Sequence, residues 1–185
     1  MTQPKKRSAA RTRPRRPVAR LSDRQIEQMA VACGALAARI VSPANVFTAS
    51  WVRWKCQYGC DGFASSLVCP PHTPTPDQTR AMLDDYRRAV LFESPLRQAK
   101  KIAVALEREL FLSGYYKALG LGAGPCRLCA ACAMEAGCRH ADQARPSMEA
   151  VGIDVYATAR RAGFTINVVR THKDPQHYFG LVLIE

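Results

Sequence analysis

The stretch Cys126-Arg-Leu-Cys129-Ala-Ala-Cys132, followed after five residues by Cys138, constrains the fold of this 185-residue chain more than any other segment. A tight turn with C-x2-C-x2-C spacing can aim three thiolates at one point, and four-cysteine sites hold zinc or an iron–sulfur cluster. The unbroken run favours the cluster, because zinc sites usually use two separated C-x2-C pairs whereas bacterial ferredoxins use this continuous spacing. This loop therefore predicts a metal centre, with zinc as the alternative.

A second cysteine group precedes it, as Cys56-Gln-Tyr-Gly-Cys60 followed after eight residues by Cys69-Pro-Pro. A Cys-Pro pair completes a cluster site in ferredoxins, which matches Cys69. The surrounding loop over 57–76 is rich in Gly and Pro, and a long loop of this kind inside a domain is usually functional. Disulfides would need an oxidising compartment, and the N-terminus shows no export signal. We therefore expect a cytoplasmic protein whose cysteines bind metal.

Two partitions of these seven thiolates are compatible with the spacing. In the local partition, each group keeps its own cysteines, so that the second loop holds a four-thiolate cluster and the first group a three-thiolate one. In the swapped partition, Cys69 completes the site of the C-x2-C-x2-C run, and Cys138 joins Cys56 and Cys60. A single cluster with leftover cysteines is a third alternative. Both two-cluster partitions leave one iron open to a substrate or a non-cysteine ligand.

Other polar residues lie next to these cysteines. His72 and His140 are the nearest non-cysteine donors, and we expect them to form hydrogen bonds beside the metal rather than to ligate it. Three cations flank cysteines directly and could raise a cluster potential or steer an anion: Lys55, Arg127 and Arg139.

Further candidates are weaker. Glu149 and Asp154 could act as acid or base, or could cap a helix and pair with Arg145. The segment 115–117, Tyr-Tyr-Lys, could line a pocket. Cys33 lies on the apolar stripe of a predicted helix, so we expect it to be a small buried hydrophobe and not a ligand.

The charge of the chain is concentrated in a tail. The net charge is +12, and eight Lys and Arg residues without any Asp or Glu lie in residues 1–20, which leaves an ordinary +4 for the rest. We predict residues 1–21 to be a disordered basic tail and 22–185 to be the cysteine-rich domain. A nucleic-acid contact by the tail is not favoured, because no aromatic residue interleaves the cations. No apolar run reaches the roughly 18 residues of a membrane span.

Hydrophobic periodicity predicts an α/β fold with a single mixed sheet of about four strands flanked by helices, and two cysteine-rich cluster-binding loops at the ends of regular elements. The predicted helices cover 23–41, 77–87, 96–119 and 147–162. The predicted strands cover 45–55, 88–94, 165–171 and 178–184, with the last two as a terminal hairpin.

The chain also resembles a known family, the predicted metal-binding proteins filed as domain of unknown function number 2284. The residues that carry the resemblance span most of the chain after the tail: 55–60, 69–74, 111–118, 124–132, 138–140 and 144–154. The resemblance implies metal binding through these cysteines. One departure is Ala141, where the family pattern leads us to expect proline.

These observations predict an iron–sulfur protein that acts in electron transfer with a redox partner protein. It would bind two [4Fe–4S] clusters through seven cysteines: Cys56, Cys60, Cys69, Cys126, Cys129, Cys132 and Cys138. One alternative is an enzyme whose open iron acts on a small-molecule substrate, and another is a zinc-stabilised interaction module. Neither a P-loop nor a dinucleotide fingerprint is present, so no nucleotide is implied. Whether the protein is an enzyme stays open.

Overall fold

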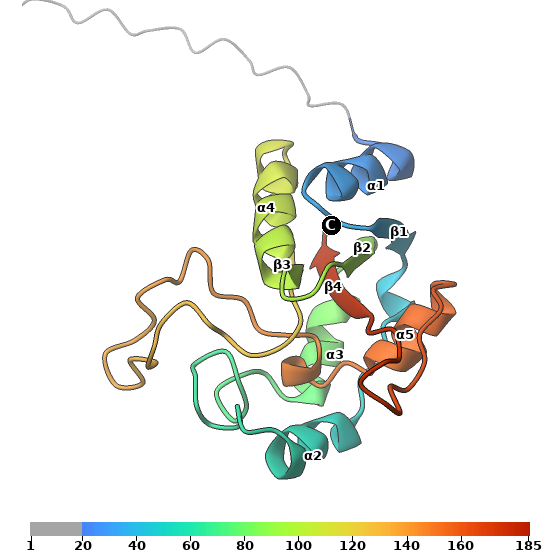
Figure 1. Ribbon diagram of the computed structural model, residues 1–185. Helices are drawn as coiled ribbons and strands as arrows, with labels where there is room; N and C mark the ends of the chain where they lie inside the picture. The colour runs from blue at the N-terminus through green and yellow to red at the C-terminus, as the bar shows by residue number, and fades with distance from the viewer. Residues whose placement is uncertain (1–19) are drawn as a thin grey trace, which may run out of the picture.

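A four-stranded sheet in the order β1-β2-β4-β3 lies at the centre of the computed structural model, which describes residues 20–185 (Figure 1). The sheet strands are β1 (Ala37–Val41), β2 (Ala89–Ser94), β3 (Leu119–Leu121) and β4 (Tyr178–Leu183). The α-helices are α1 (Asp23–Ala32), α2 (Ser50–Gly59), α3 (Pro76–Asp84), α4 (Ala99–Leu112) and α5 (Val155–Arg161). Two short 3-10 helices are η1 (Pro43–Asn45) and η2 (Glu149–Val151).

Every pair of neighbouring strands in this sheet is antiparallel. The α/β class and the four strands are confirmed, but the predicted mixed sheet is wrong. The physical reason is the position of β4, which inserts between β2 and β3 and pairs antiparallel with both. The nearly continuous apolar sequences of β2 and β4 suit their central positions, since both of their faces are covered.

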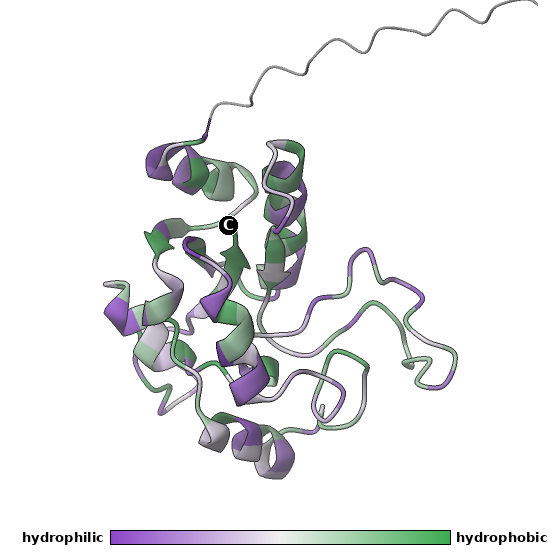
Figure 2. Cartoon of the chain, turned by 180° about the vertical axis from the view of Figure 1, so that it is seen from behind, coloured by the Kyte–Doolittle hydropathy of each residue, from purple (hydrophilic) through white to green (hydrophobic). Residues whose placement is uncertain are grey.

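The two faces of the sheet form two hydrophobic cores. Because side chains alternate along a strand, Val90 and Phe92 of β2 point to the core shared with α1 and α4, while Leu91 points to the opposite core. That opposite core also receives Leu83 from α3 and Ala159 from α5. Figure 2 shows the hydrophobic colouring gathered on the central strands and on the helix faces beside them.

Two predicted elements at the start of the domain need correction. The helix predicted over 23–41 begins with the expected capping box but ends at Ala32, because Gly34 takes a left-handed φ of 106° and the chain turns into β1. The strand predicted over 45–55 is also wrong, since residues 50–59 form α2.

The predictions for the later elements agree better with the structure. The helix over 77–87 and the strands over 88–94 and 178–184 correspond to α3, β2 and β4. The helix over 96–119 is shorter and is followed by β3, and the one over 147–162 is divided into η2 and α5. Residues 165–171 form no strand, so the predicted terminal hairpin is wrong and the partners of β4 are β2 and β3.

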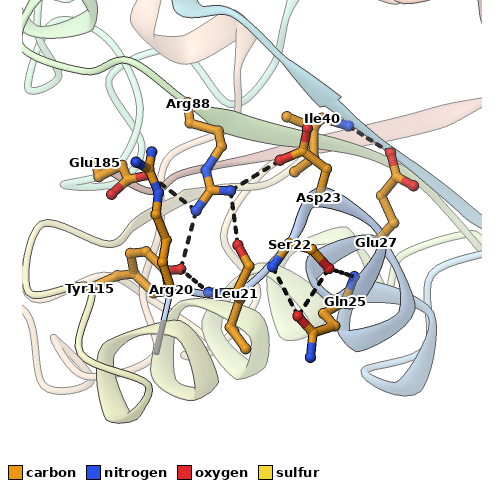
Figure 3. Close-up of polar contacts among 10 residues, drawn as sticks. All are labelled: Arg20, Leu21, Ser22, Asp23, Gln25, Glu27, Ile40, Arg88, Tyr115 and Glu185. Carbon is orange, nitrogen blue, oxygen red and sulfur yellow. Dashed lines mark hydrogen bonds and ion pairs between the residues drawn. The ribbon is translucent and has the colours of Figure 1, made fainter. Parts of the chain in front are cut away.

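Arg88 ties both ends of the described chain to β2 (Figure 3). Its guanidinium donates to the Leu21 carbonyl and to the Asp23 carboxylate, both at 3.0 Å. It also donates to the Tyr115 hydroxyl at 3.1 Å and pairs with Glu185 at 3.0 Å. Tyr115 is thereby used in structure, and the cavity that it lines shares no residue with those beside the cysteines.

The predicted basic tail falls mainly on residues 1–19, which lie outside the described residues. Its last residue, Leu21, is described, and its N–H donates to the Tyr115 hydroxyl at 2.8 Å. Within residues 20–185, none of the helices has the length and apolar character needed to cross a bilayer.

Candidate metal centre

The first cysteine group surrounds a single cavity of about 330 Å³. Cys56 lies in the last turn of α2, which ends at Gly59, and Cys60 follows directly in extended conformation; both line this cavity. Cys69 reaches the same cavity from the loop between α2 and α3 and is only 8% exposed. Three thiols from the end of α2 and from the loop that follows it therefore line one cavity.

A set of short backbone turns holds Cys69 in place. The Cys69 N–H donates to the Ser66 carbonyl, and the Cys69 carbonyl accepts from the His72 N–H, both at 3.0 Å. The Ala64 N–H donates to the Pro70 carbonyl at 2.7 Å, which closes the loop on itself. His72 thus supports the loop through its backbone, while its side chain does not line the cavity.

Arg53 connects the first cysteine loop to α2 and η2 through hydrogen bonds. From α2, its Nη1 atom lies 2.9 Å from the Thr73 hydroxyl, the Pro74 carbonyl and the Ala150 carbonyl. The Thr73 hydroxyl also donates to the Ala150 carbonyl. Hydrogen bonds from a charged donor are the stronger kind, so Arg53 fixes α2, the first cysteine loop and η2 together.

The second cysteine loop runs from the end of β3 to the start of η2 and closes on itself. The Gly122 N–H donates to the Pro146 carbonyl at 2.9 Å, and the Met148 N–H donates to the Gly122 carbonyl at 3.0 Å. Three of its cysteines are half-buried, Cys126, Cys129 and Cys132, and Cys138 is exposed. Cys126 lines a larger cavity of about 670 Å³, whereas the other three line neither cavity.

Arg145 links the end of this second loop to α4 through Glu107. Its guanidinium donates to both carboxylate oxygens of Glu107, at 2.6 and 2.7 Å, in the bidentate geometry that makes such pairs strong. It also donates to the carbonyls of Ala141 and Ala144. Glu107 in turn accepts the Gly120 N–H at 2.7 Å. The predicted pairing of Arg145 with Glu149 or Asp154 is therefore replaced by a pair with Glu107.

The two cysteine loops lie side by side, as both Figure 1 and Figure 2 show. A Cβ placed on Gly62 of the first loop would lie 3.4 Å from the Cys60 sulfur and 3.6 Å from the Pro125 Cβ. Gly124 and Pro125, which lead into Cys126, also form part of the wall of the smaller cavity. The two groups of thiols thus belong to neighbouring parts of one surface.

Lys100 of α4 lies where the two loops meet. Its Nζ atom is buried and has no hydrogen-bond partner among the described residues. Burial lowers its pKa, and three acidic groups act in the opposite direction: Cys126, Cys69 and Glu149. One ammonium therefore feels the charge of a cysteine from each loop. Sequence reasoning missed Lys100, because nothing in its local pattern sets it apart from the exposed Lys101.

Glu149 of η2 is the acidic residue most enclosed in the cysteine site. It lines the smaller cavity, and its Oε2 atom is buried without a hydrogen-bond partner in the described part of the chain. Burial raises the pKa of its carboxyl, against smaller effects from its own backbone, from Ser147 and from Lys100. The Cys56 sulfur lies 3.9 Å from the Glu149 carbonyl oxygen. Asp154 lines the same cavity but caps α5, accepting the Ala157 N–H at 3.0 Å.

The thiols of the first group influence one another. Burial raises the pKa of the Cys56 thiol, and the charges of Cys60, Glu149 and Cys69 raise it further, while Arg53 lowers it. Several groups that are anionic when ionised therefore converge on one cavity without an equal number of cations. A bound metal would supply the missing positive charge, since thiolates are its natural ligands.

The arrangement fits a soft metal by its donor chemistry, although the ligands are not gathered into a finished site. Within residues 20–185, no three His, Cys, Asp or Glu side chains form a group close enough to hold a metal ion. All eight cysteines are free thiols, so the disulfide alternative gains no support. Metal binding commonly completes the folding of such loops. Three thiols and an unpartnered carboxylate oxygen around one cavity form a donor set that suits a metal centre.

The remaining predicted residues lie away from the two cavities or on their rims. Lys55 lines the smaller cavity and Arg127 the larger one, while Arg139 and His140 line neither. Cys33 packs against the core formed by α1 and α4, in agreement with its predicted structural role.

This fold and this site define a class: an α/β protein with two adjacent cysteine-rich loops. The family model described as Predicted metal-binding protein (DUF2284) matches residues 39–184, and the chain belongs to this family. The resemblance predicted from the cysteine motifs is thereby confirmed. Neither a curated protein nor a solved structure matches the chain.

Proposed function

We propose that this protein binds two [4Fe–4S] clusters through its seven grouped cysteines and transfers electrons to a redox partner protein. The observation that carries the proposal is the common cavity of Cys56, Cys60 and Cys69 beside a separate loop with four further cysteines. When bound, the clusters would supply one-electron chemistry. Free thiols at every cysteine position suit a reducing compartment such as the cytoplasm.

The geometry favours the local partition of ligands. Cys69 shares its cavity with Cys56 and Cys60, whereas Cys138 does not line that cavity. The first cluster would then be held by three cysteines, and Cys126, Cys129, Cys132 and Cys138 would hold the second. The position left over on the first cluster would be filled from the same cavity, where Glu149 offers a carboxylate oxygen without another partner.

The surrounding chain supports electron transfer in three ways. Arg53 and Arg145 each anchor one cysteine loop, and a rigid ligand shell limits reorganisation when the charge of the centre changes. The Lys100 ammonium lies close enough to both loops to compensate negative charge on either centre. Adjacent loops would also keep two clusters near each other, which a two-centre relay requires.

A second candidate function is catalysis at the three-cysteine site. The specific observation in its favour is that the site is a cavity and not a flat surface, with the Glu149 carboxyl in its wall. A carboxyl whose pKa is raised by burial is suited to deliver a proton to a bound substrate. This candidate requires that a small molecule, and not Glu149, takes the open position.

An anaerobic redox titration followed by electron paramagnetic resonance separates these functions. Electron transfer predicts two paramagnetic centres on reduction, both unchanged by added small molecules. Catalysis at an open iron predicts that a small-molecule ligand changes the signal of one centre. A protein that holds zinc and shows no reducible centre would contradict both functions and leave the zinc-stabilised module.

A further inference from the structure

The larger cavity, of about 670 Å³, lies between the start of α4 and the second cysteine loop, and it shares only Gly124 and Pro125 with the lining of the three-cysteine cavity. Four cations line it: Arg97, Lys100, Lys101 and Arg127. The lining includes no Asp or Glu. Since the described chain as a whole carries both signs of charge, a cavity with four cations and no acid is a local excess of positive charge that favours an anion.

The first turn of α4 adds further positive potential to this cavity. No side chain caps the helix, and its first turn contains no acidic residue, so the free N–H groups of that turn keep no side-chain acceptor. Lys100 and Lys101 occupy this first turn, where the helix dipole is positive and favours anions over cations. Two lysines in the first turn destabilise the helix, and a bound anion would offset this destabilisation.

Lys100 lines the cavity with its stem, and its ammonium adds a buried positive charge behind the cavity wall. Its stem packs against Gly122, where a Cβ would lie 2.4 Å from Lys100 Cγ, and its buried Nζ has no hydrogen-bond partner in the described residues. Arg97 and Lys101 are exposed at the rim and can move to meet a ligand. The cavity thus combines one buried ammonium with three exposed cations, Arg97, Lys101 and Arg127.

The rest of the wall is mainly apolar. Leu96, Val104 and Leu128 line it, and Leu96 and Leu128 are 57% and 41% exposed in the absence of any ligand. The ring of Tyr178 and the amide of Gln143 complete it. A site of this kind, apolar with a few placed polar groups, is typical of small-molecule binding and not of a simple inorganic ion.

We propose that this cavity binds a small organic anion, namely a phosphate or carboxylate group carried on an apolar body. The anionic end lies at the first turn of α4 between Arg97 and Lys101, and the apolar body packs on Leu96 and Leu128. The inference rests on the cavity and not on the metal. Because Cys126 lines the same cavity, the bound anion lies beside the second cysteine loop.

The test uses the full chain, purified anaerobically, with phenyl phosphate as the probe and isothermal titration calorimetry as the measurement. Benzoate replaces phosphate by carboxylate, inorganic phosphate removes the apolar body, and phenol removes the charge. We expect phenyl phosphate or benzoate to bind one site. Phenol and inorganic phosphate should each bind about tenfold more weakly or not at all, because phenol lacks the anionic group and inorganic phosphate lacks the apolar body.

Variants locate the site. Arg97→Gln and Lys101→Gln should each weaken binding of the charged probe by about tenfold, the usual effect of one charge-assisted contact. Arg108→Gln is the matched control, because Arg108 is an exposed cation on the same helix that pairs with Glu109 and does not line the cavity. It should leave the dissociation constant unchanged.

Three results would overturn the inference: no binding of phenyl phosphate or benzoate, equal binding by phenol, or an equal loss in Arg108→Gln and in the two cavity variants. Metal and sulfide content is measured on every sample. A zinc-loaded, colourless protein that still binds phenyl phosphate in this pattern would contradict the iron–sulfur proposal and support this one, so the two failures are distinguishable.

Discussion

Gly122 packs directly against Lys100, so that a Cβ at position 122 would lie 2.4 Å from Lys100 Cγ and 2.9 Å from Lys100 Cα. Only glycine allows the end of β3 to lie so close to α4. This contact holds the lysine stem at the base of both cysteine loops and leaves its buried ammonium facing the charges of Cys69 and Cys126.

Gly122→Ala should therefore destabilise the protein by about 1–3 kcal/mol, the usual cost of forcing extra volume into a packed site. Denaturant unfolding of the metal-loaded protein measures the free energy. Gly59→Ala is the matched control, because nothing lies within 4 Å of a Cβ there and Gly59 is also next to a cysteine site. Equal stability of the two variants would show that the contact with Lys100 is not tight.

Lys100→Met should lower the reduction potential of both centres by on the order of 50 mV, because removing a nearby buried cation favours the less negative, oxidised state. Lys101→Met, one residue away but exposed to solvent, should have a much smaller effect, since exposed charges are screened. An anaerobic potentiometric titration measures both. Similar shifts of the reduction potential in the two variants would contradict the position of the Lys100 ammonium between the two loops.

Glu149→Gln should alter the electron paramagnetic resonance signal of one centre and leave that of the other unchanged, because the carboxylate oxygen would be lost from the three-cysteine site only. Asp154→Asn is the control within the same cavity, since asparagine caps a helix as well as aspartate does. Iron content is measured in parallel. A spectrum of Glu149→Gln identical to that of the unsubstituted protein would exclude Glu149 as a ligand.

Part of the fold and the site follows from the sequence, and the errors have physical causes. The aromatic residues Trp51 and Trp54 suggested a strand by their β propensity, but they are 48% and 65% exposed on α2 and have no packed sheet face. The position of β4 between β2 and β3 is a long-range pairing that no local pattern encodes.

The two cysteine groups were predicted as ligands from spacing alone, whereas the side chains that surround them were not predicted. Arg53, Lys100 and Glu107 act through tertiary contacts with loops that are distant in sequence. Their neighbours along the chain give no sign of these contacts, because a charged residue on a helix is usually solvated. Glu149 was identified as a polar candidate, but its burial in the cysteine cavity required the fold.

Cys33 provides a pH test of the prediction that it is structural. Burial raises the pKa of its thiol, and Glu109 raises it further. A raised folded-state pKa means that the stabilisation is present below the unfolded thiol pKa, about 8.5, and is lost as pH rises through the folded value. The stability advantage over Cys33→Ala should therefore be constant from pH 6 to about 8 and shrink above that.

The same variant tests the ligand count, because Cys33→Ala should keep the full metal content. Loss of iron in Cys33→Ala would make Cys33 an eighth ligand and remove the open position at the first site. A stability difference that stays constant into the alkaline range would show that the thiol is not buried as described.

The central claim is tested most directly by the iron, acid-labile sulfide and zinc content of the anaerobically purified protein, compared with Cys56→Ala and Cys126→Ala. The account predicts about eight irons with matching sulfide, the content of two cubane clusters, and a loss of about half in each variant. Zinc without sulfide, retained in part by both variants, would contradict the iron–sulfur proposal.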